Sequence, residues 1–208
     1  MKIKDNFADK FQITVCVIVI IIFIISVVTS ISHSSRVSSS RPSSPSRKYE
    51  CDYHTMSFKT KITFNKDDAE YTVEGNFWRL VTDPLTLSKN GDVIGKADDT
   101  YHIVNQDDHV IVINGKAEID VVGNFEVFGN SYELYNVDGI KVGSASFNSF
   151  CTSGSIVDTK GVMVAEYSKN FAVNDYTVTI YENSMCSDEA ILMIIASYVS
   201  DYQTDSSN

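Results

Sequence analysis

Two histidines and three aspartate pairs are the residues of this sequence best suited to metal chemistry. His102 and His109 flank the pair Asp107-Asp108, and Asp98-Asp99 lies just before them. Imidazole and carboxylate groups are common metal ligands. However, neither these pairs nor Asp67-Asp68 belong to a stretch with the alternating oxygen ligands and closing glutamate of an EF-hand loop. We therefore interpret them as solvent-exposed residues of surface hairpins and loops, and we predict no metal site.

Several serines lie near Cys151 in the sequence, and a hydroxyl or thiol group in this segment would be a possible nucleophile. Ser149, Ser153 and Ser155 are its neighbours, but a nucleophile needs a base beside it, and neither that pairing nor a GxSxG elbow can be found. Glycines such as Gly123 lack the strand-to-helix context of a phosphate-binding loop and are interpreted as turns or bulges. The sequence predicts no catalytic residue and no cofactor, and it leaves the ligand-binding residues unknown.

The remaining reactive side chains are the cysteines. Cys51, Cys151 and Cys186 are far apart in the sequence, Cys16 falls in an apolar run, and no CxxC or zinc-type spacing occurs. Three cysteines allow at most one internal disulfide with one thiol left over. Cys151 with Cys186 is geometrically possible but no better supported than the other pairs. Free thiols are the favoured interpretation, and the disulfide state stays open.

Charge is distributed unevenly along the 208 residues. Residues 1–48 hold seven Lys and Arg against two Asp, which leaves ten basic and 25 acidic side chains in residues 49–208. The second part therefore has a net charge near −15. Such a surface repels phosphate backbones, and no basic stripe interleaved with aromatic residues is present. Composition therefore argues against nucleic-acid binding.

An uncharged segment near the N-terminus predicts a membrane anchor. Residues 13–31 read ITVCVIVIIIFIISVVTSI, 19 residues without a charge, and a helix of that length nearly spans a hydrocarbon core of about 30 Å. The basic segment of residues 1–12 would also suit a cleaved signal peptide, but the apolar core of a signal peptide is usually shorter. We predict a single-pass membrane protein. Basic residues on both sides of the span leave its orientation and its organelle undetermined.

A tether is predicted to follow the anchor. Residues 32–48 are rich in Ser, Arg and Pro and have almost nothing to bury, so they cannot recover the entropy of ordering. Residues 49–202 are predicted to form one domain, and residues 203–208 a disordered tail. Neither phosphorylation of the tether nor an oligomeric state can be inferred from the sequence.

Short stretches of Val, Ile, Tyr, Phe and Thr with period-two alternation predict a β-rich domain. Turn pairs such as Asn90-Gly91, Asn114-Gly115 and Asp138-Gly139 join them, so neighbouring strands should form antiparallel hairpins. Twelve strands are predicted, at residues 56–64, 71–76, 85–88, 93–97, 101–105, 109–113, 117–122, 126–128, 131–135, 141–145, 162–168 and 176–181.

One helix interrupts this pattern near the C-terminus. Ser187, Asp188 and Glu189 are suited to a helix N-terminus, and the apolar residues 190–199 follow. The segment is too short to cross a bilayer, so a protein core must bury it. A closed barrel of a dozen strands has no exposed edges and has room for one helix. The predicted fold class is therefore mostly β: a closed antiparallel barrel of about 12 strands around a hydrophobic C-terminal helix, preceded by one transmembrane helix.

Several segments between residues 56 and 201 resemble the tubby C-terminal-like fold, in its LURP-one-related branch. They are Tyr71 to Phe77, Val122 to Phe125, Tyr132 to Tyr135, Asp138-Gly139, Val142 to Ala145, Val164 to Lys169, Asp175 to Val178 and the terminal helix. The resemblance implies a twelve-stranded barrel around a hydrophobic helix. These residues are turn glycines and alternating core positions, so the match specifies a fold rather than an activity.

Phospholipid scramblases, distantly similar, and phosphoinositide-binding tubby proteins share this fold, so the resemblance implies a role near a membrane. Lipid binding of the tubby type relies on basic side chains, for which the candidates here are Lys59, Lys61, Arg79, Lys89, Lys96, Lys116, Lys141, Lys160 and Lys169. We expect a non-enzymatic, membrane-anchored module that binds a lipid headgroup, peptide or partner protein. The alternatives are a scramblase-like protein and an enzyme that uses the barrel mouth.

Overall fold

A computed structural model describes residues 40, 46–56, 59–76, 84–100, 108–124, 130–148, 151–170, 175–182 and 185–205. All of them belong to the unit formed by residues 39–208. No helix among these residues is long and apolar enough to cross a membrane. The predicted span at residues 13–31, the basic segment before it and most of the predicted tether lie outside the described residues.

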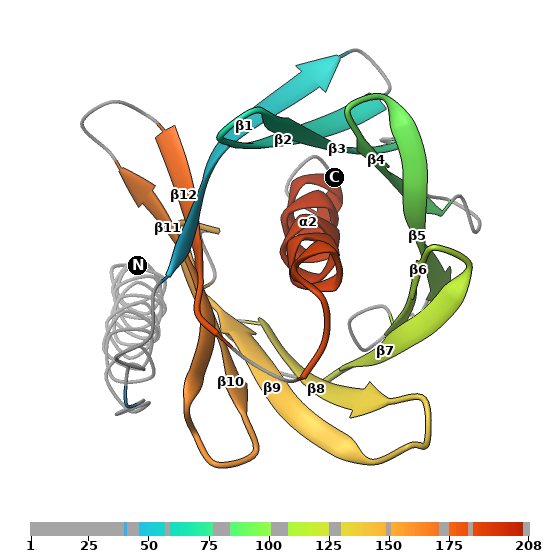
Figure 1. Ribbon diagram of the computed structural model, residues 1–208, viewed down its shortest axis with the longest axis vertical. Coiled ribbons are helices and arrows are strands. Elements are labelled where there is room, and N and C mark those ends of the chain that lie inside the picture. The colour runs from blue at the N-terminus through green and yellow to red at the C-terminus, as the bar shows by residue number, and fades with distance from the viewer. Residues whose placement is uncertain are drawn as a thin grey trace, which may run out of the picture. The chain divides into compact units, whose positions relative to one another are not determined.

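The described residues form a closed, twelve-stranded antiparallel barrel with a helix in its centre, as predicted (Figure 1). Each strand pairs with the next along the chain, and β1 closes the barrel by pairing with β12. The elements are β1 (Arg47–Met56), β2 (Lys59–Lys66), β3 (Ala69–Asn76), β4 (Leu85–Lys89), β5 (Asp92–Thr100), β6 (Asp108–Ile113), β7 (Lys116–Gly123), β8 (Asn130–Asn136), β9 (Lys141–Phe147), β10 (Ser153–Asp158), β11 (Met163–Asn170), β12 (Asp175–Ile180) and α2 (Asp188–Asp205).

Tight turns gather at one end of the barrel, which we call the hairpin end. It contains the turns at residues 67–68, 90–91, 114–115, 137–140 and 159–162, together with the start of β1 and the start of α2. Asn90 and Asn114 have φ of 51°, and the glycines that follow them also have positive φ. This is the backbone that a two-residue hairpin turn requires, so the prediction from the Asn-Gly pairs is confirmed.

Helix α2 forms the centre of the core. Its residues 190–200 are all at most 5 % exposed, and they pack against inward-facing side chains of the strands. In β6 and β7 these side chains alternate along each strand, as the period-two pattern predicts. Toward the end opposite the hairpin end, the ring of Tyr198 stacks on Phe147 with centroids 3.9 Å apart. The helix thus fills the barrel with apolar and aromatic side chains.

Two strands differ from the sequence prediction. The prediction omits β1, although Tyr49, Cys51 and Tyr53 alternate in RKYECDYHTM, and it omits β10, because SGSIVD is too polar to show a strand pattern. Their pairing with neighbouring strands holds them in the sheet nonetheless. Conversely, the strands predicted at residues 101–105 and 126–128 lie outside the described residues. The predicted number of strands agrees with the barrel, but two of its members are different segments.

The boundaries of the domain also need correction. Strand β1 begins at Arg47, inside the predicted tether, because Arg47 to Cys51 pair with β12. Further back, Ser40 forms an isolated bridge with Val162, and its carbonyl accepts a hydrogen bond of 3.3 Å from the Met163 N–H. At the other terminus α2 continues to Asp205, so the predicted tail at 203–208 begins within the helix.

Candidate functional site

The start of α2 is held by hydrogen bonds from its own residues and from the barrel wall. Ser187 acts as the N-cap: its Oγ accepts a hydrogen bond of 3.2 Å from the Ala190 N–H. The Ser187 N–H and hydroxyl in turn donate to Glu118 Oε2, at 3.0 and 2.8 Å. In a capping box a glutamate within the helix accepts from the N-cap N–H. Here Glu118 on β7 does so, which joins the helix to the wall.

Glu118 reaches the helix because it sits at a β-bulge. Four hairpins of the barrel shift register near the hairpin end, and each shift leaves one extra residue on the second strand. A bulge re-aims side chains relative to the regular pleat. The extra residues are Ile94, Glu118, Val142 and Val164. Three of the four are apolar and pack against the core, so the glutamate is the exception.

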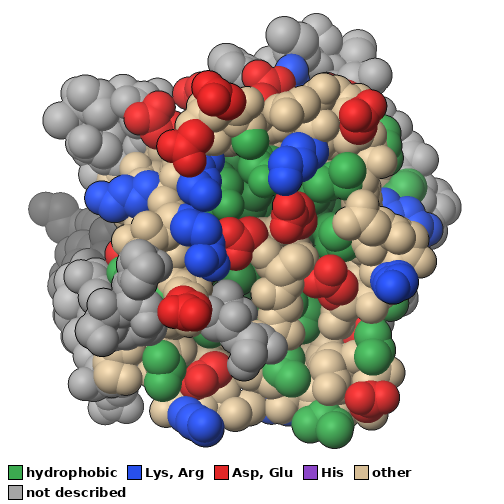
Figure 2. Space-filling model, in the orientation of Figure 1, with side chains coloured by type: hydrophobic (Ala, Val, Ile, Leu, Met, Phe, Trp, Pro, Cys, Tyr) green, Lys and Arg blue, Asp and Glu red, His purple; other side chains and the backbone are tan. Residues whose placement is uncertain are grey.

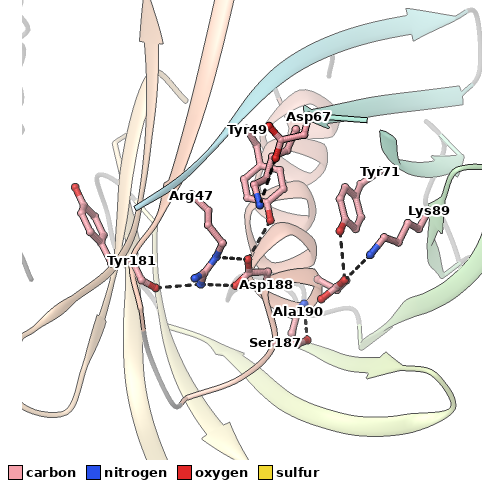
Figure 3. A network of polar contacts seen from close by, with 11 residues as sticks. Arg47, Tyr49, Asp67, Tyr71, Lys89, Tyr181, Ser187, Asp188 and Ala190 are labelled. Carbon is pink, nitrogen blue, oxygen red and sulfur yellow. Dashed lines mark hydrogen bonds and ion pairs between the residues drawn. The ribbon is translucent and has the colours of Figure 1, made fainter. Parts of the chain in front are cut away.

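A first ion-pair cluster joins β1 to α2 (Figure 3). Arg47 contacts Asp188 in a bidentate arrangement, Nε to Oδ2 at 2.5 Å and Nη2 to Oδ1 at 2.7 Å. The Tyr49 hydroxyl donates to Asp188 Oδ2 at 3.0 Å. The hydrogen bonds to Asp188 raise the pKa of Arg47. The pKa of Tyr49 is raised mainly by burial and, to a smaller extent, by the negative charge of Asp188. At neutral pH the guanidinium therefore stays charged and the phenol stays protonated.

A second cluster lies beside the first, on β3 and β4. Glu189 accepts from the Tyr71 hydroxyl at 3.4 Å and from Lys89 Nζ at 3.5 Å, and Lys89 Nζ lies 4.9 Å from the centre of the Tyr71 ring. On β2, which pairs with β1, Lys66 Nζ lies 5.7 Å from the centre of the Tyr49 ring. The Tyr49 and Tyr71 rings meet edge to face at 5.9 Å. Aromatic rings and cations thus surround the first turn of the helix.

We call these residues the polar mouth: Arg47, Tyr49, Lys66, Tyr71, Lys89, Glu118, Ser187, Asp188 and Glu189. Figure 2, which shows the same face as Figure 1, places basic and acidic side chains close together around apolar ones at its centre. The side chain of Lys66 is 32 % exposed and that of Lys89 is 41 % exposed. The mouth therefore has two partly exposed cations, each with one ion-pair contact among the described residues: Lys66 with Asp67 at 3.9 Å and Lys89 with Glu189 at 3.5 Å.

This arrangement suits recognition and structural closure better than bond-breaking chemistry. Asp188 and Glu189 each accept from a cation and a phenol, so neither is placed as a base beside a nucleophile. The raised pKa of Tyr49 makes its phenol a weak acid. Among the described residues, no group of three His, Cys, Asp or Glu side chains could hold a metal ion.

Comparison of the chain with models of protein families, with curated proteins and with solved structures finds no match. The resemblance to the tubby-like fold therefore stays a prediction from the residues. The described structure agrees with the architecture that this resemblance implies, a twelve-stranded barrel with a C-terminal helix, and it tests nothing further of the resemblance.

Of the residues singled out for metal chemistry, the structure places Asp99 and His109 opposite each other in the β5–β6 pairing, but no group of three possible ligands forms among the described residues. Asp98 pairs with Lys96 at 2.6 Å, and Asp108 accepts a hydrogen bond of 2.8 Å from the Gly123 N–H. His109 is buried at 1 % exposure on β6. His102 and Asp107 lie outside the described residues. The carboxylates of Asp98 and Asp108 therefore stabilise their own and neighbouring strands, and this role explains them without a metal ion.

The cysteines occupy opposite ends of the barrel. Cys186 lies just before α2 at the hairpin end, whereas Cys151 lies in the β9–β10 connection at the other end. A disulfide requires Cα atoms within about 7 Å, so the pairing of Cys151 with Cys186, which the sequence leaves open, does not suit these positions, and the favoured interpretation of free thiols agrees with the structure. None of the three described cysteines forms a disulfide. Burial raises the pKa of the Cys151 and Cys186 thiols to about 12 and also raises the pKa of Cys51, so all three are poor nucleophiles at neutral pH.

Sequence reasoning found one basic residue of the mouth and missed two. Lys89 is among the candidates from the sequence, but Arg47 falls in the predicted tether, and Lys66 is not included. Three of the other candidates have local partners: Asp98 for Lys96 at 2.6 Å, Glu133 for Lys141 at 2.7 Å, and the Tyr176 ring for Lys169 at 5.1 Å. A signal for Arg47 was present in the sequence: the Tyr49 and Cys51 alternation that follows it continues back to residue 47.

Proposed function

We propose that this protein is a non-enzymatic, membrane-anchored binding module whose ligand-binding surface is the polar mouth. One observation carries the proposal: the mouth lies at the hairpin end, where the chain arriving from the predicted anchor joins β1. A single-pass anchor at residues 13–31 would hold the barrel beside the bilayer. The mouth then meets lipid headgroups and the membrane-proximal parts of other proteins.

The chemistry of the mouth favours a ligand with an anionic group. Lys66 and Lys89 are partly exposed, and their ion-pair contacts with Asp67 and Glu189 are longer than that of Arg47 with Asp188. The packed interior supports binding at this surface, because the apolar face of α2 occupies the centre of the barrel. A phospholipid headgroup is the first ligand to test, since the anchor would present headgroups at high local concentration. A peptide or partner protein is the second.

The test uses the purified full chain in maltoside micelles, which contain no phospholipid. Water-soluble headgroups, namely glycerophosphocholine, glycerophosphoserine and inositol trisphosphate, are titrated while thermal unfolding is followed by circular dichroism. We expect at least one of them to raise the unfolding midpoint saturably. The double variant Lys66→Ala/Lys89→Ala should lose this response. The matched control Lys116→Ala/Lys160→Ala, which removes two exposed lysines outside the mouth, should keep it.

If no headgroup binds, the peptide and protein ligands are tested with a photo-cross-linking residue at exposed Asn90, next to Lys89, in native membranes. A discrete cross-linked partner that disappears with Lys66→Ala/Lys89→Ala would support the proposal. It fails if neither headgroups nor a partner show any dependence on these two lysines.

A further inference from the structure

Exposed apolar side chains gather at the hairpin end. Among the described residues, the exposed large hydrophobic side chains are Val93 at 69 %, Val110 at 39 %, Val137 at 63 % and Ile140 at 60 %. Val110 lies on the wall of the barrel, in β6. The other three lie at the hairpin end, with Val137 and Ile140 together in the single turn between β8 and β9. Isolated exposed apolar residues need no explanation, but a pair at one tip does.

The turn between β8 and β9 holds this pair rigidly toward solvent. The Asn136 Oδ1 accepts hydrogen bonds from the Asp138 and Ile140 N–H groups at 3.0 and 2.9 Å. The Asn136 N–H donates to the Ile140 carbonyl at 2.9 Å. Because the backbone is ordered in this way, burying the pair in a partner requires little further ordering.

Amphipathic side chains follow immediately behind the apolar tip. Tyr135 and Lys141 pair across the two strands, and both bind Glu133, with Lys141 Nζ at 2.7 Å from Glu133 Oε1. Tyrosine and lysine near an apolar segment are typical of the membrane interface, where the ring or stem lies at headgroup depth and the polar tip stays in water. The hairpin thus has the order of groups that suits shallow contact with a bilayer.

The chain that joins the barrel to the predicted anchor is short. Ser40 is bound to Val162 and Met163 beside the β10–β11 turn, so only residues 32–39 lie between the predicted span and this contact. Eight fully extended residues reach at most about 28 Å. This length keeps the hairpin end close to the bilayer at high effective concentration. A contact of two side chains, too weak to recruit a free domain, can then be well populated.

We propose that the hairpin end of the barrel rests on the lipid bilayer, with Val137 and Ile140 inserted among the headgroups. This inference rests on the membrane anchor of the proposed function but does not depend on a ligand for the mouth. It places the polar mouth at the headgroup layer.

The experiment uses the full chain reconstituted in phosphatidylcholine vesicles that contain a phospholipid with a diazirine on its acyl chain close to the headgroup, so that groups at headgroup depth are labelled. After illumination, labelled positions are mapped by mass spectrometry. We expect label in residues 13–31 and, separately, in residues 136–141. Val137→Ser/Ile140→Ser should reduce labelling of the hairpin several-fold and leave that of residues 13–31 unchanged. The control Val110→Ser, which removes an exposed valine from the barrel wall, should leave both unchanged.

The outcomes separate the two proposals. Label in residues 13–31 with none above background in the hairpin would overturn the bilayer contact and keep the anchor. Label in neither segment would overturn both the contact and the anchor. Label in the hairpin that is unaffected by Val137→Ser/Ile140→Ser would also overturn the inference, since the contact would then not depend on these side chains.

Discussion

Glu118 is the one residue at the four β-bulges of the hairpin end that binds the start of α2. At three of the four bulges the extra residue is Ile94, Val142 or Val164, each packed against the core. The fourth places a carboxylate where the helix begins and satisfies the N–H and hydroxyl of Ser187. A partly buried helix N-terminus needs such a partner, because its first N–H groups have no acceptor within the helix.

We predict that Glu118→Ala destabilises the protein by about 1–3 kcal/mol, because the partly buried donors of Ser187 lose their acceptor. Chemical denaturation of the full chain in micelles, followed by circular dichroism, measures the change. Glu74→Ala, which truncates an exposed glutamate of β3, serves as the control and should alter the free energy of unfolding by less than about 0.5 kcal/mol. Equal effects of the two substitutions would contradict the role given to Glu118.

At the scale of the element, the hairpins are shaped by glycines as well as by bulges. Gly143 on β9 faces the core, and a Cβ at this position would lie 2.4 Å from the Val157 carbonyl oxygen and 2.9 Å from Met185 Sδ. The Met185 side chain can move, but the carbonyl belongs to the backbone of β10. Gly143 therefore allows β10 and the segment before α2 to approach β9 closely.

We predict that Gly143→Ala lowers the free energy of unfolding by about 1–3 kcal/mol, because the added methyl group forces a backbone shift in a packed sheet. Ser146→Ala, on the exposed face of the same strand, provides a control for the change in strand composition. The two variants are compared by urea titration under identical conditions. A neutral Gly143→Ala would show that β9 and β10 separate more easily than the structure indicates.

In the molecule as a whole, the barrel and its helix share one hydrophobic core. The strands contribute one layer of inward side chains, and α2 supplies the apolar surface that covers them. Ion pairs at the hairpin end and the Tyr198–Phe147 stack toward the other end hold the helix along its length. Without the helix, the inner wall of the barrel would face water.

We predict that removing residues 187–208 abolishes cooperative unfolding, because the inward side chains of the strands lose their partner surface. Thermal scans should show no sharp transition, and the dye ANS should bind the exposed apolar surface. Removing only residues 206–208, which follow the helix, provides the control and should leave the midpoint unchanged. A truncated chain that still unfolds sharply at the original temperature would refute the central role of α2.

Local sequence patterns were enough to predict the closed antiparallel barrel, ten of the twelve described strands, the two Asn-Gly turns and the presence and burial of the C-terminal helix. These features depend on local information: alternation with period two, turn residues that accept positive φ, and an apolar run behind an N-cap.

Tertiary structure alone decided the rest. Strands β1 and β10 are formed through pairing with their neighbours, and the polar mouth joins residues as distant as Arg47 and Asp188, 141 positions apart. The capping of Ser187 by Glu118 spans 69 positions and depends on a bulge that no local pattern marks. The separation of Cys151 from Cys186 follows from the direction in which the helix enters the barrel. Such contacts are set by closure of the sheet, which brings side chains together according to strand order and register rather than sequence spacing.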